Sequence, residues 1–174
     1  MWWLARPLVR LRTPPLAITA LGAIAALGAV AVAPWWAAVL VTMAVLLDAL
    51  DGAVAVLSNR ASSAGAVADR VADRIADCAF AAVIWRCGAP WLLAVSAAGL
   101  SMLLEGWREV RRGHLLTTIT VAERPTRAIC TLLACVCAGV SAATWPATVC
   151  AAVWCVLGVL ALVHFRVINS RCPH

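Results

Sequence analysis

The sequence of 174 residues contains little charge and lacks both lysine and tyrosine. Charged residues make up 13% of the chain, hydrophobic residues make up 64%, and the mean hydropathy is +0.95. Soluble domains carry about a quarter charged residues and roughly half apolar ones. This composition excludes an ordinary soluble globular enzyme. It also excludes a disordered chain, because disorder requires low hydrophobicity.

The eight cysteines lack the paired Cys-x-x-Cys spacing of a zinc or disulfide framework. Most of them fall inside apolar stretches of the sequence. Free cysteine behaves as a small hydrophobic residue in such surroundings. We therefore interpret these side chains as buried packing residues.

Six apolar stretches are each close to the roughly 20 residues that cross a bilayer. Proline, glycine and serine separate them. We predict one all-α domain over residues 1–174, an integral membrane bundle of six transmembrane helices. The expected spans are Leu16–Ala33, Trp36–Leu57, Ala66–Trp85, Trp91–Trp107, Ala128–Ala143 and Ala147–Phe165. Residues 1–15 form a juxtamembrane segment, which suits either a short amphipathic helix in the headgroup plane or a basic tail that fixes orientation.

Because lysine is absent, all 14 basic residues are arginines, and they give a formal net charge of +6. With the N-terminus inside, only Arg86 falls on the outer side of the predicted bundle. This bias follows the positive-inside rule and predicts a multi-pass protein of the cell membrane with both termini in the cytoplasm. In so apolar a chain, the basic excess indicates membrane lipids as partners and not nucleic acid.

Five aspartates stand in or beside the second and third predicted spans, at Asp48, Asp51, Asp69, Asp73 and Asp77. An Asp at the centre of a membrane helix costs roughly 2.5–3.5 kcal/mol on insertion scales. Asp48 and Asp51 are three residues apart, and Asp69 and Asp73 are four apart, so each pair shares one helix face. A short loop joins the two spans, so both pairs should meet just below the cytoplasmic surface.

Four carboxylates at one place repel one another unless cations lie between them. Oxygen ligands of this kind suit Mg²⁺ or Mn²⁺, and two such ions close together can clamp a phosphoryl group. We therefore predict two divalent cations at Asp48, Asp51, Asp69 and Asp73. Asp77 lies one turn further along, where an interaction with Arg74 or with Asp73 is open, and a buried ion-pair role is favoured over metal ligation. Gly52 and Gly65 flank the aspartates, where small residues allow a ligand to approach closely.

The stretch from Asp48 to Asp73 resembles the signature of the CDP-alcohol phosphotransferases. That signature has two Asp three apart, Gly, two residues, Ala-Arg, eight residues, Gly, and two Asp four apart. Asp48, Asp51, Gly52, Ala55, Gly65, Asp69 and Asp73 match it. One position departs, because Val56 stands where the family has Arg. Arg60, one helical turn later, is a hypothetical substitute for the missing guanidinium.

The resemblance implies transfer of a substituted phosphate from a CDP-alcohol, often CDP-diacylglycerol, to an acceptor alcohol with release of CMP, as in phospholipid biosynthesis. It implies that Asp73 is the general base, that the four aspartates hold the metals, and that Gly52, Ala55 and Gly65 border the nucleotide. A homodimer is implied by the resemblance alone. For the acceptor, Arg124 and Arg127 at the start of the fifth span are the main candidates and Arg111 and Arg112 weaker ones, because the Arg fork suits phosphate oxygens. Positive-inside topology alone explains any single one of these arginines at least as well.

Two other functions fit part of the pattern. Aspartates inside a membrane also serve ion-coupled or proton-coupled transporters. The cluster lies near one surface, however, and no inverted repeat is detectable, which argues against transport. The other alternative is a catalytically weakened paralogue that acts as a membrane scaffold. Val56 favours that alternative, and the four intact signature aspartates oppose it.

Overall fold

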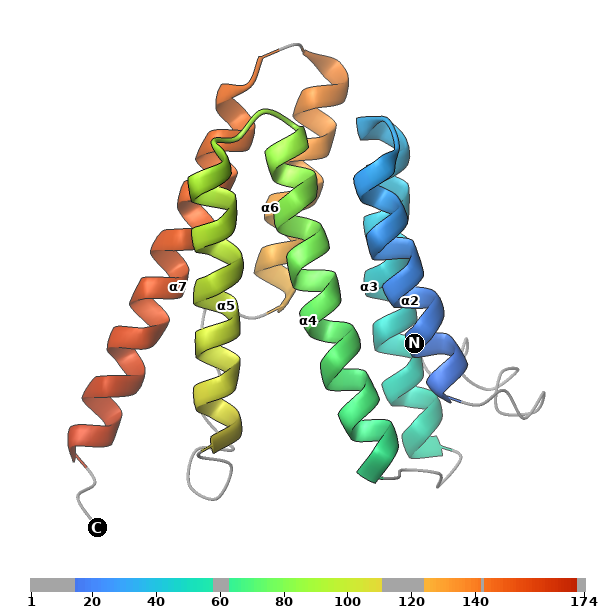
Figure 1. The fold of residues 1–174 in the computed structure, drawn as a ribbon, viewed down its shortest axis with the longest axis vertical. Coiled ribbons are helices and arrows are strands. Elements are labelled where there is room, and N and C mark those ends of the chain that lie inside the picture. The colour runs from blue at the N-terminus through green and yellow to red at the C-terminus, as the bar shows by residue number, and fades with distance from the viewer. Residues whose placement is uncertain (1–14, 58–62, 111–123, 142, 172–174) are drawn as a thin grey trace. The chain divides into compact units, whose positions relative to one another are not determined.

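The computed structural model describes residues 15–57, 63–110, 124–141 and 143–171, and these form six α-helices without a strand. Figure 1 shows the helices in chain order. They are α2 (Pro15–Ala31), α3 (Pro34–Leu57), α4 (Ser63–Arg86), α5 (Trp91–Val110), α6 (Arg124–Val140) and α7 (Trp145–Arg171). The prediction of an all-α chain with six helices is confirmed.

Proline is the first or second residue of four of these helices, at Pro15, Pro34, Pro125 and Pro146. A proline in the first turn is tolerated because the N–H group it lacks would have no partner within the helix. Five of the six predicted spans start later than the observed helices, by one residue at α2 and by four residues at α6. The fifth and sixth spans are predicted from Ala128 and Ala147, whereas α6 and α7 include the prolines and the residues before them. The predicted N-terminal segment, except for Pro15 itself, lies outside the described residues.

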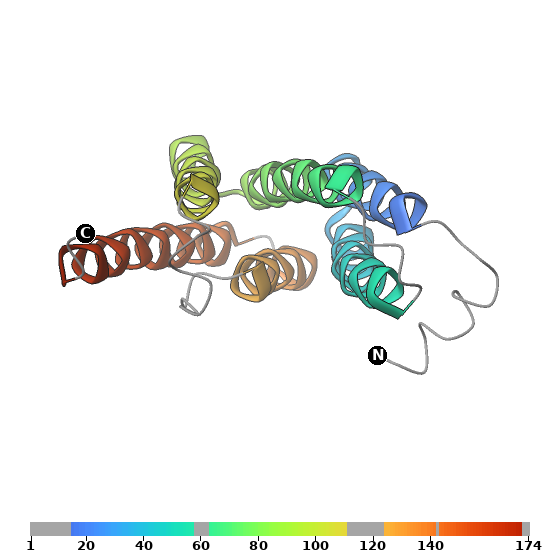
Figure 2. The ribbon, with the colours of Figure 1, turned by 90° about the horizontal axis from the view of Figure 1, so that it is seen from below.

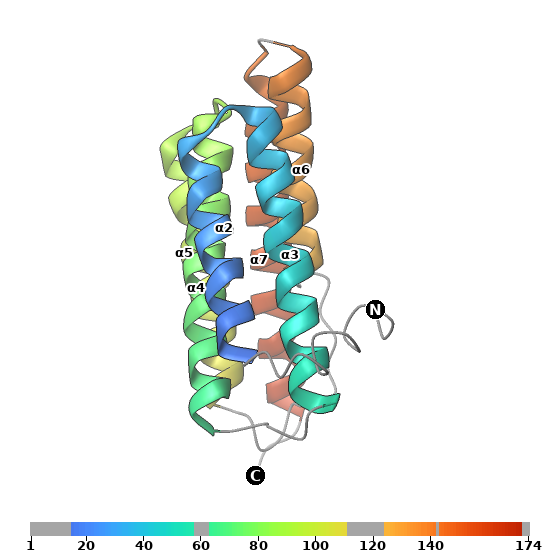
Figure 3. The ribbon, with the colours of Figure 1, turned by 90° about the vertical axis from the view of Figure 1, so that its right-hand side faces the viewer.

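The chain divides into two compact units, Met1–Phe80 and Ala81–His174. In the first unit α2 packs along α3, and the two helices run side by side in Figure 3. Ile18 and Val54 are buried between them, with Leu47, Leu50 and Ala53 packed against this pair. The first part of α4 also belongs to this unit.

In the second unit α7 contacts both α5 and α6, as the end-on view of Figure 2 shows. Leu104, Ala161 and Phe165 form a buried cluster between α5 and α7. The indole Nε1 of Trp154 donates a hydrogen bond of 2.9 Å to Ser101 Oγ in the interior. This bond satisfies the polar end of a large buried side chain.

Helix α4 ends at a glycine in a left-handed conformation. Gly88 has a φ of 108°, its N–H donates to the carbonyl of Trp85, and the N–H of Ala89 donates to the carbonyl of Ile84. This hydrogen-bond pattern is the Schellman motif that terminates many helices. Pro90 follows and prevents the helix from continuing.

Within the described residues, two helices are long and apolar enough to cross a membrane. These segments are Pro34–Val54, of 21 residues, and Trp145–Val167, of 23 residues. Only 28% and 33% of the residues in their most apolar windows are buried in the protein, so most of their side chains are at least partly exposed. Leu16–Ala31 and Pro125–Val140 are shorter apolar helices. Together these features indicate association with a membrane.

Candidate metal centre

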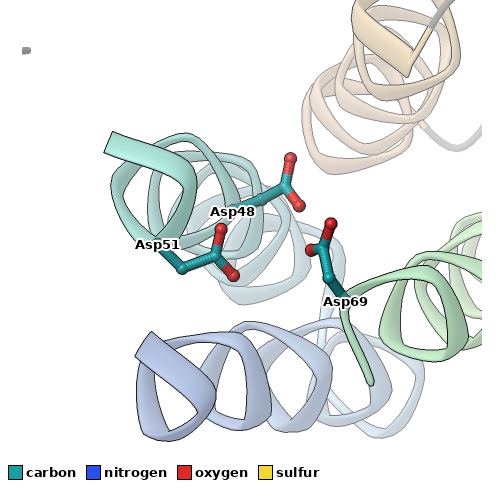
Figure 4. Close-up of side chains that lie close together, drawn as sticks. All are labelled: Asp48, Asp51 and Asp69. Atoms are coloured by element: carbon teal, nitrogen blue, oxygen red, sulfur yellow. The ribbon is translucent and has the colours of Figure 1, made fainter. Parts of the chain in front are cut away.

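Three aspartate side chains of the first unit converge on one another. Asp48 and Asp51 come from α3 and Asp69 comes from α4, and Figure 4 shows the three carboxylates pointing into a common space. One carboxylate oxygen from each residue lies within 4.8 Å of the other two. The structure thus brings together residues separated by 21 positions in the sequence, as the spacing of the aspartates predicts.

The three carboxylates differ in exposure to solvent. Asp51 is buried, with 6% of its surface exposed, whereas Asp48 and Asp69 are partly exposed. A site with one buried and two accessible carboxylates can hold a small cation and still admit a ligand from solvent. The donor set consists only of carboxylate oxygens, which is the chemistry that Mg²⁺ and Mn²⁺ prefer. The residues therefore fit a divalent cation.

Asp73 lies on α4 one turn beyond Asp69, and its side chain is partly buried. It does not belong to the group of three whose oxygens lie within 4.8 Å of one another. Its spacing from Asp69 still places it on the same face of α4. Its roles as fourth metal ligand and as general base therefore stay predictions.

A threonine on α2 completes the environment of the buried carboxylate. Thr19 Oγ1 donates a hydrogen bond of 2.6 Å to Asp51 Oδ2, and 9% of the surface of Thr19 is exposed. This contact was not expected from the sequence. The available signal was a single hydroxyl in an otherwise apolar stretch, because Thr19 is the only polar side chain of α2.

Two of the four nucleotide-binding candidates are glycines whose surroundings the structure describes. Gly52 is exposed, and a Cβ added to it would meet no atom within 4 Å. Gly65 lies near the start of α4 and is partly buried. Ala55 lies in α3, but its side chain is outside the described part of the chain, and Arg60 lies between the described segments. Of these four candidates, Gly52 has open space beside its Cα.

Asp77 lies outside the metal group and forms an ion pair. Only 2% of its surface is exposed, and its Oδ2 lies 3.4 Å from Arg74 Nη1 on the same helix. The predicted ion-pair role is confirmed. Since a buried charge is costly without a partner, Arg74 offsets part of that cost.

The basic residues proposed for the acceptor belong to the second unit. Arg127 Nη2 on α6 donates to Glu105 Oε1 on α5 at 3.0 Å, and 2% of the surface of Arg127 is exposed. Arg108 Nη1 lies 3.4 Å from the same oxygen, and its guanidinium stands 5.4 Å from the centre of the Phe165 ring. Arg127 is therefore a buried, ion-paired side chain, a feature that the sequence did not predict.

The side chains of the other acceptor candidates lie outside the described part of the chain. Arg124 is the first residue of α6, and only its backbone is described. Arg111 and Arg112 lie wholly outside the described residues. Their proposed contacts with an acceptor therefore rest on the sequence.

Comparison with known protein families gives one match. Residues 12–162 match the model of the family described as CDP-alcohol phosphatidyltransferase. No curated protein and no solved structure matches the chain. The matched range includes the three converging aspartates, Thr19 and Arg127, and it covers most of the 174 residues.

Proposed function

This chain belongs to the CDP-alcohol phosphatidyltransferase family, and from that premise we propose that it moves a phosphatidyl group from CDP-diacylglycerol to the hydroxyl of an acceptor alcohol, with release of CMP, in phospholipid biosynthesis. The family accounts for a CDP-alcohol donor and an alcohol acceptor. The observation that carries the proposal is the convergence of Asp48, Asp51 and Asp69. An unneutralised group of three carboxylates in an apolar protein has no stabilising role of its own.

In this proposal Asp48, Asp51, Asp69 and Asp73 hold two divalent cations, Mg²⁺ or Mn²⁺. When bound, such ions neutralise the diphosphate of the donor and stabilise the departing CMP. Asp73 accepts the proton of the acceptor hydroxyl as that oxygen attacks the phosphorus. The bond from phosphorus to the CMP oxygen breaks, and CMP leaves as an anion. Atoms and charge balance, because the proton passes to the carboxylate and then to solvent.

The donor nucleotide is proposed to lie against Gly52, Ala55 and Gly65, with Arg60 supplying the positive charge that Val56 lacks. Gly52 supports this placement, because the space beside its Cα is open. A backbone without side chains allows a ligand to approach closely. A guanidinium from Arg60 would pair with the diphosphate.

For the acceptor we propose Arg124, Arg127 and Arg112, which suit an alcohol that carries a phosphate. Their position at and before the start of α6 supports this choice. Arg127 is buried and already paired with Glu105 at 3.0 Å, so its part in this proposal rests on the sequence pattern.

We also propose that the chain is a multi-pass protein of the plasma membrane with both termini and the site on the cytoplasmic side, and that it forms a homodimer. The arginine distribution supports this orientation. The apolar segments Pro34–Val54 and Trp145–Val167 support spanning. The homodimer rests on the family alone.

The test is an assay of the detergent-purified protein with CDP-diacylglycerol, Mg²⁺ or Mn²⁺, and a panel of acceptor alcohols with and without phosphate. Released CMP is quantified and the lipid products are identified by mass. We expect one acceptor to give a new phospholipid in an amount equal to the CMP. The variant Asp69→Asn should lose this activity, and Glu109→Gln, which removes an exposed acid outside the site, should keep it. Absence of CMP release with every acceptor would refute the proposal and would favour a scaffold.

A further inference from the structure

One hydrogen bond at the metal centre comes from a helix that carries none of the aspartates. Thr19 on α2 donates to Asp51 Oδ2 at 2.6 Å across 32 positions of the sequence. This length is typical of a strong hydrogen bond from a hydroxyl to a carboxylate. Both partners are buried, with 9% and 6% of their surfaces exposed. Water therefore competes little for this contact.

The contact differs from that of another threonine in the same unit. Thr42 Oγ1, on the exposed face of α3, donates to the carbonyl of Ala38 in its own helix at 2.8 Å. That is the usual partner of a threonine hydroxyl inside a helix. Thr19 instead reaches a carboxylate on the neighbouring helix, which places its hydroxyl at the edge of the metal centre.

Close packing of α2 on α3 keeps the hydroxyl within reach. Gly22 lies one turn after Thr19, and a Cβ added to it would stand 3.5 Å from the Ala44 carbonyl oxygen and from Leu47 Cβ, and 4.0 Å from the backbone nitrogen of Asp48. Small residues allow two helices to approach in this way. The approach occurs at the level of the aspartates, so the same packing sets the distance from Thr19 to Asp51.

We propose that Thr19 is a positioning residue for the metal centre, in which its hydroxyl fixes the orientation of the Asp51 carboxylate and thereby raises the affinity for the divalent cation. The hydrogen bond to Oδ2 restricts rotation of the Asp51 carboxylate. The lone pairs of this carboxylate that are not used by Thr19 therefore keep a fixed direction towards the cation. Partners of this kind behind a metal ligand typically contribute 10–100-fold in metal affinity. The inference rests on the proposed function, because that function requires the metal.

The experiment measures Mn²⁺ binding without substrate, by the electron paramagnetic resonance signal of free Mn²⁺ titrated against detergent-purified protein. Thr19→Val removes the hydroxyl and keeps the branched shape, and Thr19→Ser keeps the hydroxyl. Thr42→Val is the matched control, because it removes a threonine hydroxyl of the same unit that bonds only to its own helix among the contacts described.

We expect Thr19→Val to weaken Mn²⁺ binding about 10–100-fold, and Thr19→Ser and Thr42→Val to stay within about threefold of the wild type. Wild-type affinity in Thr19→Val would overturn the proposal. So would a Thr19→Ser variant that binds as weakly as Thr19→Val, because the hydroxyl would then not be the cause. If Thr19→Val does not fold, Thr19→Ala removes the hydroxyl without adding bulk, and wild-type affinity in that variant would overturn the proposal equally.

The same titration separates this inference from the proposed function. Protein that binds Mn²⁺ in a Thr19-dependent manner but releases no CMP would support the positioning role and refute the transferase. Protein that releases CMP while Thr19→Val binds Mn²⁺ normally would support the transferase and refute the positioning role.

Discussion

Replacing Asp69 by asparagine should stabilise the protein when no metal is present. Asp48, Asp51 and Asp69 offer oxygens within 4.8 Å of one another. At that separation two unit charges repel by about 0.9 kcal/mol in water and by about 3.5 kcal/mol at an effective dielectric constant of 20. Asp69→Asn removes two of the three pairs. The relief therefore lies between about 2 and 7 kcal/mol.

Because Asp48 and Asp69 are partly exposed, solvent screens their charges, and we expect a gain close to the lower figure. A gain of about 2 kcal/mol raises the unfolding midpoint of a chain of this length by roughly 4–8 °C. Saturating Mn²⁺ should act mainly on the wild type, which keeps all three carboxylates. It should stabilise the wild type by about 2.7 kcal/mol at 100 times the Kd and should have little effect on Asp69→Asn.

The assay is thermal unfolding in detergent, with a chelator or with Mn²⁺, followed by a dye that becomes fluorescent on reacting with thiols. Cys130 and Cys135 are buried in the fold, so unfolding exposes them to the dye. Glu109→Gln is the control, because it removes one negative charge at an exposed position outside the centre. An Asp69→Asn midpoint no higher than that of the chelator-treated wild type, or equal stabilisation of both by Mn²⁺, would refute the reasoning.

Three further substitutions test other parts of the account. Gly52→Ala meets no atom within 4 Å and should fold normally, gaining up to about 1 kcal/mol in helix propensity, while the KM for the CDP-alcohol rises at least several-fold in the CMP-release assay. Gly88→Ala should lower the unfolding free energy by on the order of 1–3 kcal/mol, because φ is 108° and the new Cβ would lie 2.5 Å from Thr144 Cγ2. Glu105→Gln should cost about 3 kcal/mol in chemical denaturation, because it removes the carboxylate that faces the buried Arg127.

For each of these substitutions, one result would contradict the prediction. An unchanged KM in Gly52→Ala would place the nucleotide elsewhere. Gly106→Ala meets no atom within 4 Å and serves as the control for Gly88→Ala, so an equal loss in both would contradict the steric argument. Glu109→Gln, at an exposed position of the same helix as Glu105, should change the unfolding free energy by less than about 1 kcal/mol. A similar loss in the two glutamate variants would contradict the role of the Arg127 ion pair.

The aspartates could be predicted from the sequence, because their spacing fixes which of them share a helix face. Asp48 and Asp51 three apart, and a short connection to the helix of Asp69, were enough to place three carboxylates together. Thr19 could not be predicted in this role. A lone threonine in an apolar helix usually bonds to its own backbone, and only the packing of α2 on α3 brings its hydroxyl to Asp51.

The first residues of two helices and the ion pair of Arg127 could not be predicted from the sequence. Hydropathy marks the apolar part of a helix, so it missed the first residues of α6 and α7, where proline is compatible with the first turn. The charge pattern assigned Arg127 to the cytoplasmic side as a candidate acceptor ligand. It did not reveal that Glu105, 22 positions earlier in the chain, pairs with that guanidinium, because such contacts depend on which helices are neighbours.

The central claim is that Asp48, Asp51 and Asp69 share a divalent cation. Crystals grown with Mn²⁺ and a CDP-alcohol would test it most directly, through anomalous scattering recorded at the manganese absorption edge. The account predicts an anomalous peak in contact with oxygens of all three side chains. A peak elsewhere, or a bound CDP-alcohol with no manganese between these carboxylates, would contradict it.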